Sequence, residues 1–391
     1  MGDFEERTNE MRMNHMRVMY ISNRSRYDIG ARNHLDALKE LLGEDNILHV
    51  NIRADVPAEK KENYISFGKY KNAAERIYRW LQGNGMYMSN GIIHELYDFI
   101  VNEKIEIVFL EESILGKLVK HIKINCPNVK VVVFYHDIGA DLFRQWRKRA
   151  NWIGKIENTI SLYQEKLTIR YADIHAALHK EDDMRMWQFY KRHSDILIPL
   201  SSREHENMNN FEVCAGAGEK KKILFVGSSY YPNILGMRWF YKEVLPYLEG
   251  DFEIEVVGRG LEVLREEFCD DRVQVIGTVD SLDSYYREAD MFIAPIFDGG
   301  GMKVKSMEAV SYAKCFVGTT GSLAGFWDEM DDTVKNHIVF RSDDASEWVH
   351  ILNTLIRKKV MKHNKELYEI FKCRFSYEKT KELIASCIWS E

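Results

Sequence analysis

The chain has 391 residues, of which 54 are Lys or Arg, 60 are Asp or Glu and 45% are hydrophobic. This composition is typical of a globular protein and excludes a disordered, collagen-like or low-complexity chain. The length predicts two or three domains. The formal net charge of −6 argues against a chain-wide nucleic-acid interface, because neutralising phosphates takes an excess of cations.

Cysteine usage and hydropathy indicate the compartment. The six cysteines form no CxxC pair and no cluster with zinc-ligand spacing, so we expect them to be reduced and mostly packed. No apolar run approaches the roughly 18 residues of a membrane-spanning helix, and residues 1–16 are too polar for a secretory signal. The sequence therefore predicts a cytoplasmic protein and still allows peripheral attachment to the inner face of a membrane.

The N-terminal half alternates apolar strands with helices. After a flexible segment at 1–15, strands are expected at 17–22, 105–110, 129–135 and 196–200. Apolar residues at helical spacing follow the turn at Gly30. Short runs that are apolar on both faces and separated by helices are typical of a parallel sheet covered on both sides. Residues 16–205 are therefore predicted to form a Rossmann-like domain.

The same pattern restarts after a predicted linker at 206–222. Strands are expected at 223–226, 252–257, 273–276, 291–295 and 315–318. The predicted fold class is α/β, with two doubly wound Rossmann-like domains facing each other across a cleft. The second domain is expected over 223–374, and an amphipathic helix at 375–391 is expected to cross back to the first domain.

The most informative pattern is a glycine-rich loop between a strand and a helix. The strand ends at Pro295, Gly299–Gly301 follow, and a helix is expected to begin near Met302. Glycines let the backbone approach a ligand, and the free N–H groups of a new helix favour an anion. Lys305 and Glu308 share a helix face. A cation beside phosphates and a carboxylate facing a vicinal diol describe a nucleoside diphosphate, and a plain strand-to-helix connection with a surface ion pair is the alternative.

Other strands of this half are also followed by glycine, at Gly227, Gly258 and Gly277. With the segments 223–227, 255–259, 275–277 and above all 295–309, the pattern resembles the donor domain of GT-B glycosyltransferases. The closest resemblance is to the retaining family-four group (glycosyl transferases group 1), in the branch with a Gly-Gly-Gly loop followed by Lys and then Glu-Ala. It is strong in the C-terminal half and extends to the first half in layout and a few positions.

The resemblance implies roles for individual residues. Glu308 would bind the ribose hydroxyls, Gly299, Gly300 and Gly301 would face the diphosphate and sugar, and Lys305 would neutralise phosphate. His136, directly after a strand, resembles the family's histidine that contacts the donor sugar. The further expected donor-binding residues are Gly30, Gly227, Ser228, Arg259, Gly277, Val279, Met302 and Lys303. An ordinary turn glycine remains the alternative for Gly30. Gly300 also departs from the family, because a first glutamate is common there.

Basic and aromatic residues alternate over 142–155 in the first domain. Such a segment suits an anionic bilayer surface or a phosphate-bearing acceptor, and a solvated helix face with inward aromatics is the alternative. The residues assigned to this acceptor or membrane side are Asp137, Arg144, Trp146, Arg147, Lys148, Arg149 and Trp152.

The predicted function is glycosyl transfer of the hexosyltransferase type, with retention as the resemblance implies. A nucleoside diphosphate sugar, preferably a UDP-sugar, is the expected donor. The expected acceptor is a glycan or lipid-linked molecule of bacterial surface polysaccharide or glycoconjugate assembly. No cofactor and no nucleic-acid partner are expected. No metal is expected either, because the chain has no Asp-x-Asp motif. The alternatives are a sugar-nucleotide epimerase and a catalytically silent binding subunit. An NAD dehydrogenase is weaker, because GxGxxG lacks its third glycine after Gly258 and Gly260.

Overall fold

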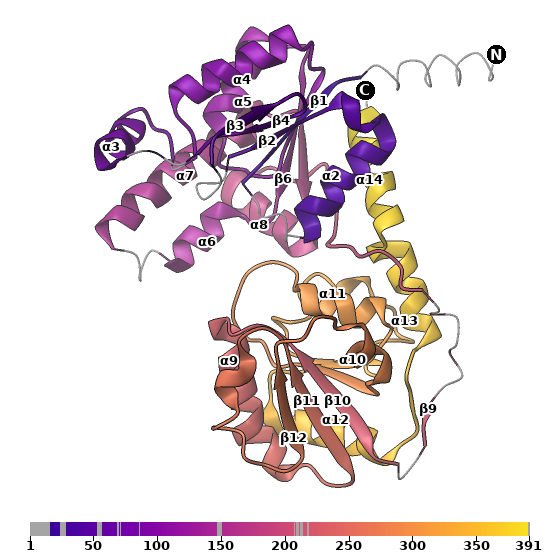
Figure 1. Cartoon of the computed structure of the whole chain (residues 1–391). Helices are drawn as coiled ribbons and strands as arrows, with labels where there is room; N and C mark the ends of the chain where they lie inside the picture. The colour runs from indigo at the N-terminus through magenta and orange to yellow at the C-terminus, as the bar shows by residue number, and fades with distance from the viewer. Residues whose placement is uncertain are drawn as a thin grey trace, which may run out of the picture. The chain divides into compact units, whose positions relative to one another are not determined.

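The structure is a computed structural model of the chain, and it describes residues 16–23, 29–52, 57–68, 70, 72–85, 87–146, 151–206, 208, 211, 214–216 and 219–389. The chain divides into two compact units (Figure 1). Unit 1 comprises Met1–Pro199 and Thr380–Glu391, and unit 2 comprises Leu200–Lys379. Each unit is an α/β domain with a mainly parallel sheet, as the sequence predicts.

Unit 1 is built around a sheet in which β3 alone among the described strands pairs antiparallel. Its strands are β1 (Val18–Ser22), β2 (Ile47–Asn51), β3 (Glu59–Lys61), β4 (Tyr64–Ser66), β5 (Ile107–Leu110), β6 (Lys130–Tyr135), β7 (Ile174–Ala177) and β8 (Ile196–Leu197). They pair in the order β3-β4-β2-β1-β5-β6-β7-β8. The chain builds outward from β1 in one direction through β2 and in the other through β5, so the topological switch point lies between β1 and β5.

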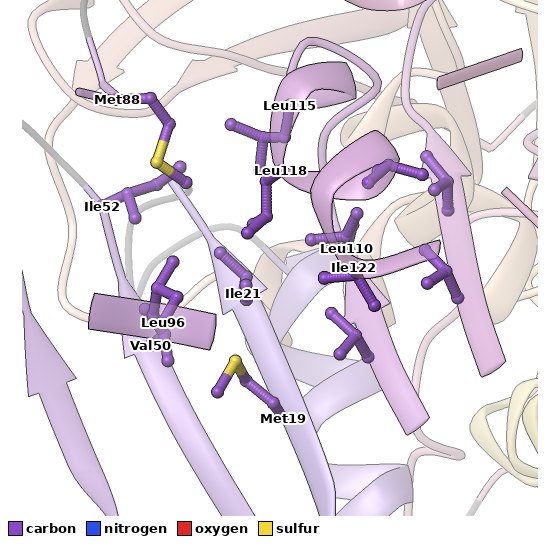
Figure 2. Packing of buried hydrophobic residues seen from close by; sticks show 14 of the residues in the cluster. Met19, Ile21, Val50, Ile52, Met88, Leu96, Leu110, Leu115, Leu118 and Ile122 are labelled. Atoms are coloured by element: carbon purple, nitrogen blue, oxygen red, sulfur yellow. The ribbon is translucent and has the colours of Figure 1, made fainter. Parts of the chain in front are cut away.

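Helices cover both faces of this sheet. They are α2 (Ile29–Leu42), α3 (Ala73–Leu81), α4 (Asn90–Asn102), α5 (Gly116–Asn125), α6 (Gly139–Trp146), α7 (Trp152–Tyr171), α8 (Lys180–Tyr190) and most of α14 (Tyr377–Trp389). Successive strand residues point to opposite faces. Figure 2 shows Met19 and Ile21 of β1 in a cluster with Leu96 of α4 and Leu118 of α5. Between them, Tyr20 points the other way, and its hydroxyl donates to the carbonyl of Ala31 in α2 at 2.7 Å.

Unit 2 has a wholly parallel main sheet in the order β12-β11-β10-β13-β14-β15. Its strands are β10 (Lys221–Val226), β11 (Phe252–Val257), β12 (Val273–Gly277), β13 (Met291–Ala294), β14 (Cys315–Gly318) and β15 (Val339–Arg341), and a separate antiparallel pair joins β9 (Cys214–Ala215) to β16 (Val360–Met361). Its helices are α9 (Tyr231–Trp239), α10 (Asp283–Glu288), α11 (Val304–Ser311), α12 (Ala345–Arg357) and α13 (Lys365–Ile370). The switch point of this sheet lies between β10 and β13.

The segment before β10 is less of a linker than the sequence predicts. β10 begins at Lys221, two residues before the expected strand. The Lys221 side chain is buried, and its ammonium donates to the carbonyls of Gly216 and Glu219. At the other end of the expected linker, the backbone carbonyl of Glu206 accepts a hydrogen bond from the guanidinium of Arg287 at 2.9 Å. Parts of the expected linker are therefore packed against unit 2.

Cysteine burial is mixed. None of the five cysteines whose side chains the structure describes forms a disulfide; Cys315 and Cys387 are buried, whereas Cys269 and Cys373 are exposed. The expectation that the cysteines are mostly packed is therefore only partly right. Within the described ranges, every helix is too short or too polar to cross a bilayer.

Candidate functional site

The switch point of unit 2 brings the loops after β10 and β13 together. In open α/β sheets, ligands bind in the crevice outside the carboxyl ends of the strands at this point. Gly227 and Ser228 follow β10, and the glycine-rich loop follows β13. Close packing keeps this region compact, since a Cβ built on Gly236 of α9 would lie 1.7 Å from the carbonyl oxygen of Pro295. The predicted donor residues of both loops therefore lie at the edge of the sheet where a ligand is expected.

The glycine loop folds around the side chain of Lys303. The Lys303 ammonium donates to the carbonyls of Gly299 and Gly300, both at 3.0 Å, and of Gly301 at 2.7 Å. Gly299 and Gly301 have φ values of +106° and +64°, which residues with a Cβ rarely adopt. The glycines are thus required by the turn itself, and the charge of Lys303 is already engaged by the loop.

Helix α11 begins directly after this loop, at Val304, two residues later than the sequence suggests. Lys303 is its N-cap residue, no side chain caps the helix, and its first turn contains no acidic residue. The N–H groups of the first turn and the helix dipole favour an anion at this end. Lys305 and Glu308 lie one turn apart on this helix.

The ammonium of Lys305 is largely buried beside the loop after β10. It donates to the side-chain oxygen of Asn233 and lies 5.2 Å from the centre of the Phe225 ring. The amide nitrogen of Asn233 in turn donates to the carbonyl of Ser228 at 2.9 Å. Burial, with a smaller contribution from the neighbouring charge of Lys303 and against the opposing effect of Glu308, lowers the pKa of Lys305 to about 7. A bound anion, in addition to Glu308, would favour the protonated and positively charged form of Lys305.

Glu308 is held by an aromatic residue of α10. The hydroxyl of Tyr286 donates to its carboxylate at 3.0 Å, and the Tyr286 ring stacks on Tyr312 with centroids 4.8 Å apart. Burial raises the pKa of Glu308, while the hydrogen bond from Tyr286 and the charge of Lys305 oppose that rise. The hydrogen bond from Tyr286 therefore holds the carboxylate of this half-buried residue in orientation.

The remaining predicted donor residues have diverse surroundings. Arg259, after β11, is exposed, and its guanidinium has no hydrogen-bond or ion-pair partner among the described residues. Gly277 has a φ of +82°, and a Cβ there would meet the side chain of Glu262 at 2.5 Å. That carboxylate accepts from the N–H of Thr278 at 2.6 Å, and this bond lowers its pKa to about 2. Val279 is half-buried next to this contact.

Met302 differs from the expected donor contact. Its side chain is buried, and its sulfur accepts a hydrogen bond from the backbone N–H of Leu200 at 3.4 Å. The thioether is thus committed to packing within unit 2. The chain therefore approaches the glycine loop at Leu200, which the sequence does not indicate.

In unit 1, the switch point holds a buried carboxylate between two histidines. Glu111, directly after β5, accepts from Nε2 of His136 at 2.7 Å and from Nδ1 of His34 at 2.8 Å. Burial alone would raise the pKa of Glu111, but the charges and hydrogen bonds of the two imidazoles hold it well below its usual range. With Glu111 ionised, His136 carries a proton on Nε2. Gly30 is buried in the first turn of α2, the helix that carries His34.

Comparison with known proteins gives a family match for most of unit 2 and a fold match for nearly the whole chain. Residues 220–358 match the family model described as glycosyl transferases group 1. The folds of three solved structures cover nearly the whole chain. Sucrose-phosphate synthase from Thermosynechococcus elongatus is 13% identical with a TM-score of 0.63, covering 95% of this chain and 98% of its own. HepE from Anabaena in complex with UDP is 12% identical with a TM-score of 0.65, covering 96% and 100%. The lipopolysaccharide outer core galactosyltransferase WaaB is 12% identical with a TM-score of 0.64, covering 96% and 99%.

The chain has the GT-B glycosyltransferase fold. At these identities the solved structures show the fold alone, whereas the family match covers the unit that holds Lys305 and Glu308. A search of curated proteins gave no significant match.

The predicted acceptor-side residues of this GT-B protein are only partly described. Arg144 is exposed on α6, and Trp152, the first residue of α7, is 68% exposed. Asp137 is half-buried after β6. Trp146 ends α6, but its side chain lies outside the described part, as do residues 147–149. The described residues of this set therefore lie in the loop after β6 and on helices α6 and α7.

Two site residues escaped the sequence analysis. Glu111 carries a usable signal, because an acid directly after an apolar strand falls at the ligand-binding edge of a parallel sheet. Asn233 carries none, since an asparagine at the start of a helix is common as a cap. Within the described ranges, no group of three or more His, Cys, Asp or Glu side chains is arranged to hold a metal ion.

Proposed function

We propose that the protein transfers a sugar from a nucleoside diphosphate sugar, preferably a UDP-sugar, to a glycan or lipid-linked acceptor with retention of configuration. The observation that carries the proposal is the start of α11, where uncapped N–H groups, the Lys305 ammonium and the Glu308 carboxylate follow the glycine loop in that order. The HepE structures in complex with UDP and with UDP-glucose support this donor class.

The chemistry follows from the charges. In transfer, the bond between the anomeric carbon and the diphosphate oxygen breaks, the acceptor oxygen bonds to that carbon, and the hydroxyl proton leaves with the diphosphate. Negative charge then builds on the leaving group, where the helix N-terminus and Lys305 stabilise it. Lys303 is a poorer candidate, because its ammonium is bonded to three carbonyls. These groups supply the stabilisation without a metal ion.

Glu308 and His136 complete the proposal. Glu308 accepts hydrogen bonds from the ribose hydroxyls, and Tyr286 holds the carboxylate for that role. His136 contacts the donor sugar, a role that rests on the family resemblance. The hydrogen bond between its Nε2 and the Glu111 carboxylate holds the ring in orientation for that role.

The test is thermal stabilisation of the full chain by UDP, UDP-sugars, other nucleoside diphosphates and NAD. A ligand at about one hundred times its Kd adds about 2.7 kcal/mol to the free energy of unfolding. We expect UDP to give this shift, Glu308→Ala to remove it, and the exposed Glu243→Ala to keep it. Stabilisation by NAD alone, or an undiminished UDP shift in Glu308→Ala, would overturn the proposal.

Turnover separates transfer from its alternatives. Release of UDP that requires an acceptor indicates a transferase, interconversion of the donor sugar indicates an epimerase, and binding without product indicates a silent subunit. Metal independence is tested in the same assay. Loss of transfer with a chelator, restored by a divalent cation, would contradict it.

A further inference from the structure

A cavity of about 710 Å³ lies within unit 1 between α6, α7 and α8. This volume is in the range of small-molecule sites. The lining residues used below are Phe143 and Arg144 of α6, Lys155, Thr159, Leu162 and Lys166 of α7, and Phe189 of α8. The four α7 residues recur three or four positions apart, so they form one stripe of that helix. Figure 1 shows α6, α7 and α8 as neighbours in unit 1.

Buried hydrogen bonds hold the three helices around this cavity. The carboxylate of Glu165 in α7 is completely buried and accepts from the N–H groups of Gly139 and Ala140 at 2.9 and 3.0 Å, at the start of α6. It also accepts from the hydroxyls of Ser113, at 2.8 Å, and Tyr190. The hydroxyl of Tyr190 is thus engaged within the protein. The cavity is therefore formed before any ligand arrives.

The middle of the cavity is apolar. Phe143 of α6, Leu162 of α7 and Phe189 of α8 line it, and each of these side chains is half-buried. Covering such half-buried apolar side chains with hydrocarbon is favourable, because it removes apolar surface from water. A purely polar ligand would leave this gain unused.

The charged lining residues are all cations. Arg144, Lys155 and Lys166 are exposed, and none has a hydrogen-bond or ion-pair partner among the described residues. The acids on neighbouring turns are engaged elsewhere, Asp141 with Arg185 at 3.4 Å and Glu157 with Arg76 at 2.5 Å. Lys155 and Lys166 are about 16 Å apart along α7, at a rise of 1.5 Å per residue. Positive charge is therefore spread along the α7 side of the cavity lining.

We propose that this cavity binds a single-chain lipid phosphate. The hydrocarbon chain lies against Phe143, Leu162 and Phe189, and the phosphate is held by the unpaired cations. An inorganic anion would not use the apolar lining, and an uncharged lipid would leave the cations without a counter-charge. The site does not depend on the proposed transfer of sugar, because it lies wholly in unit 1 and shares no residue with the donor site.

The test is binding of farnesyl phosphate, below its micelle-forming concentration, to the full chain without any donor. Native mass spectrometry or isothermal titration compares it with farnesol, inorganic phosphate, an acidic amphipathic peptide and anionic phospholipid vesicles. We expect farnesyl phosphate to bind with a stoichiometry of one and the others to bind at least about tenfold more weakly.

Variants locate the site. Lys155→Glu combined with Lys166→Glu should weaken binding about tenfold or more, because both attractive charges become repulsive. The exposed Lys359→Glu in unit 2 matches the kind of charge change and should have no effect. Thr159→Trp fills the cavity without changing charge and should also abolish binding. The melting temperature without ligand verifies folding of each variant.

Several outcomes would overturn the proposal. Equal binding of farnesol removes the phosphate from it, and equal binding of inorganic phosphate removes the chain. Binding to vesicles alone indicates a membrane-surface patch, and preference for the peptide indicates a protein partner. Binding of farnesyl phosphate that survives both the charge reversal and Thr159→Trp places the lipid elsewhere. UDP stabilisation is measured in parallel, so failure of the donor site is recognised separately.

Discussion

The protonation of Lys305 should control donor affinity. Burial lowers the pKa of this residue to about 7, so the free protein holds a mostly neutral amine above that pH. A bound diphosphate raises the pKa again, because an opposite charge at close range favours the ammonium. Binding therefore takes up a proton, and affinity must rise as the pH falls towards 7 and level off below it.

The magnitude follows from the fraction of protein that is protonated. At about pH 8.5, some 1.5 units above the pKa, protonation costs about 2 kcal/mol, since each pKa unit is worth 1.36 kcal/mol. At about pH 6 the cost is negligible. The Kd for UDP-glucose should therefore increase about thirtyfold from pH 6 to pH 8.5. UDP-glucose is preferred over UDP because its diphosphate is esterified at both ends and has no proton to lose in this range.

The assay is isothermal titration in buffers of different ionisation enthalpy, which also reports the proton taken up. Lys305→Arg keeps a permanent charge and should bind with an affinity nearly independent of pH. Lys305→Met should bind weakly throughout, and the exposed Lys242→Met should retain the wild-type profile. If the Kd for UDP-glucose is independent of pH in the wild type, or still rises with pH in Lys305→Arg, then protonation of Lys305 does not control donor affinity.

Two further predictions concern stability and are measured by urea unfolding. The pKa of Glu111 is lower in the folded protein than its ordinary 4.5, so its contribution is present above that pH and is lost as the pH falls further. Glu111→Gln should lower the free energy of unfolding by about 3 kcal/mol at neutral pH and by less in acid; an equal loss at both would contradict this. Gly236→Ala should cost about 3 kcal/mol, because its Cβ would lie 1.7 Å from a backbone oxygen of Pro295. Gly91→Ala, where the nearest atom is 3.7 Å away, should be neutral or stabilising, and a similar loss in both would rule out the steric explanation.

The fold class and the glycine-rich loop could be predicted from local patterns in the chain. Strands 252–257 and 315–318 were predicted with the observed bounds, because the first alternates apolar and acidic residues before ending in two valines and the second is a short apolar run bounded by turns, and both patterns are typical of strands. The spacing of Lys305 and Glu308 places them on one face of α11 whatever the rest of the chain does. Strands β2, β4, β7 and β15 were not predicted, because they are short or interrupted by polar residues.

The contacts between side chains that are distant in the sequence depend on the folded chain. Glu111 joins His34 and His136 across separations of 77 and 25 residues, and Asn233 meets Lys305 across 72. Periodicity shows that a side chain turns inward but not what it contacts there, since strand order and loop path set its partners. Lys303 differs, because its ammonium is engaged by the carbonyls of its own loop. Local spacing therefore determines which side chains share a helix face, and long-range packing determines the charge states of the side chains in the site.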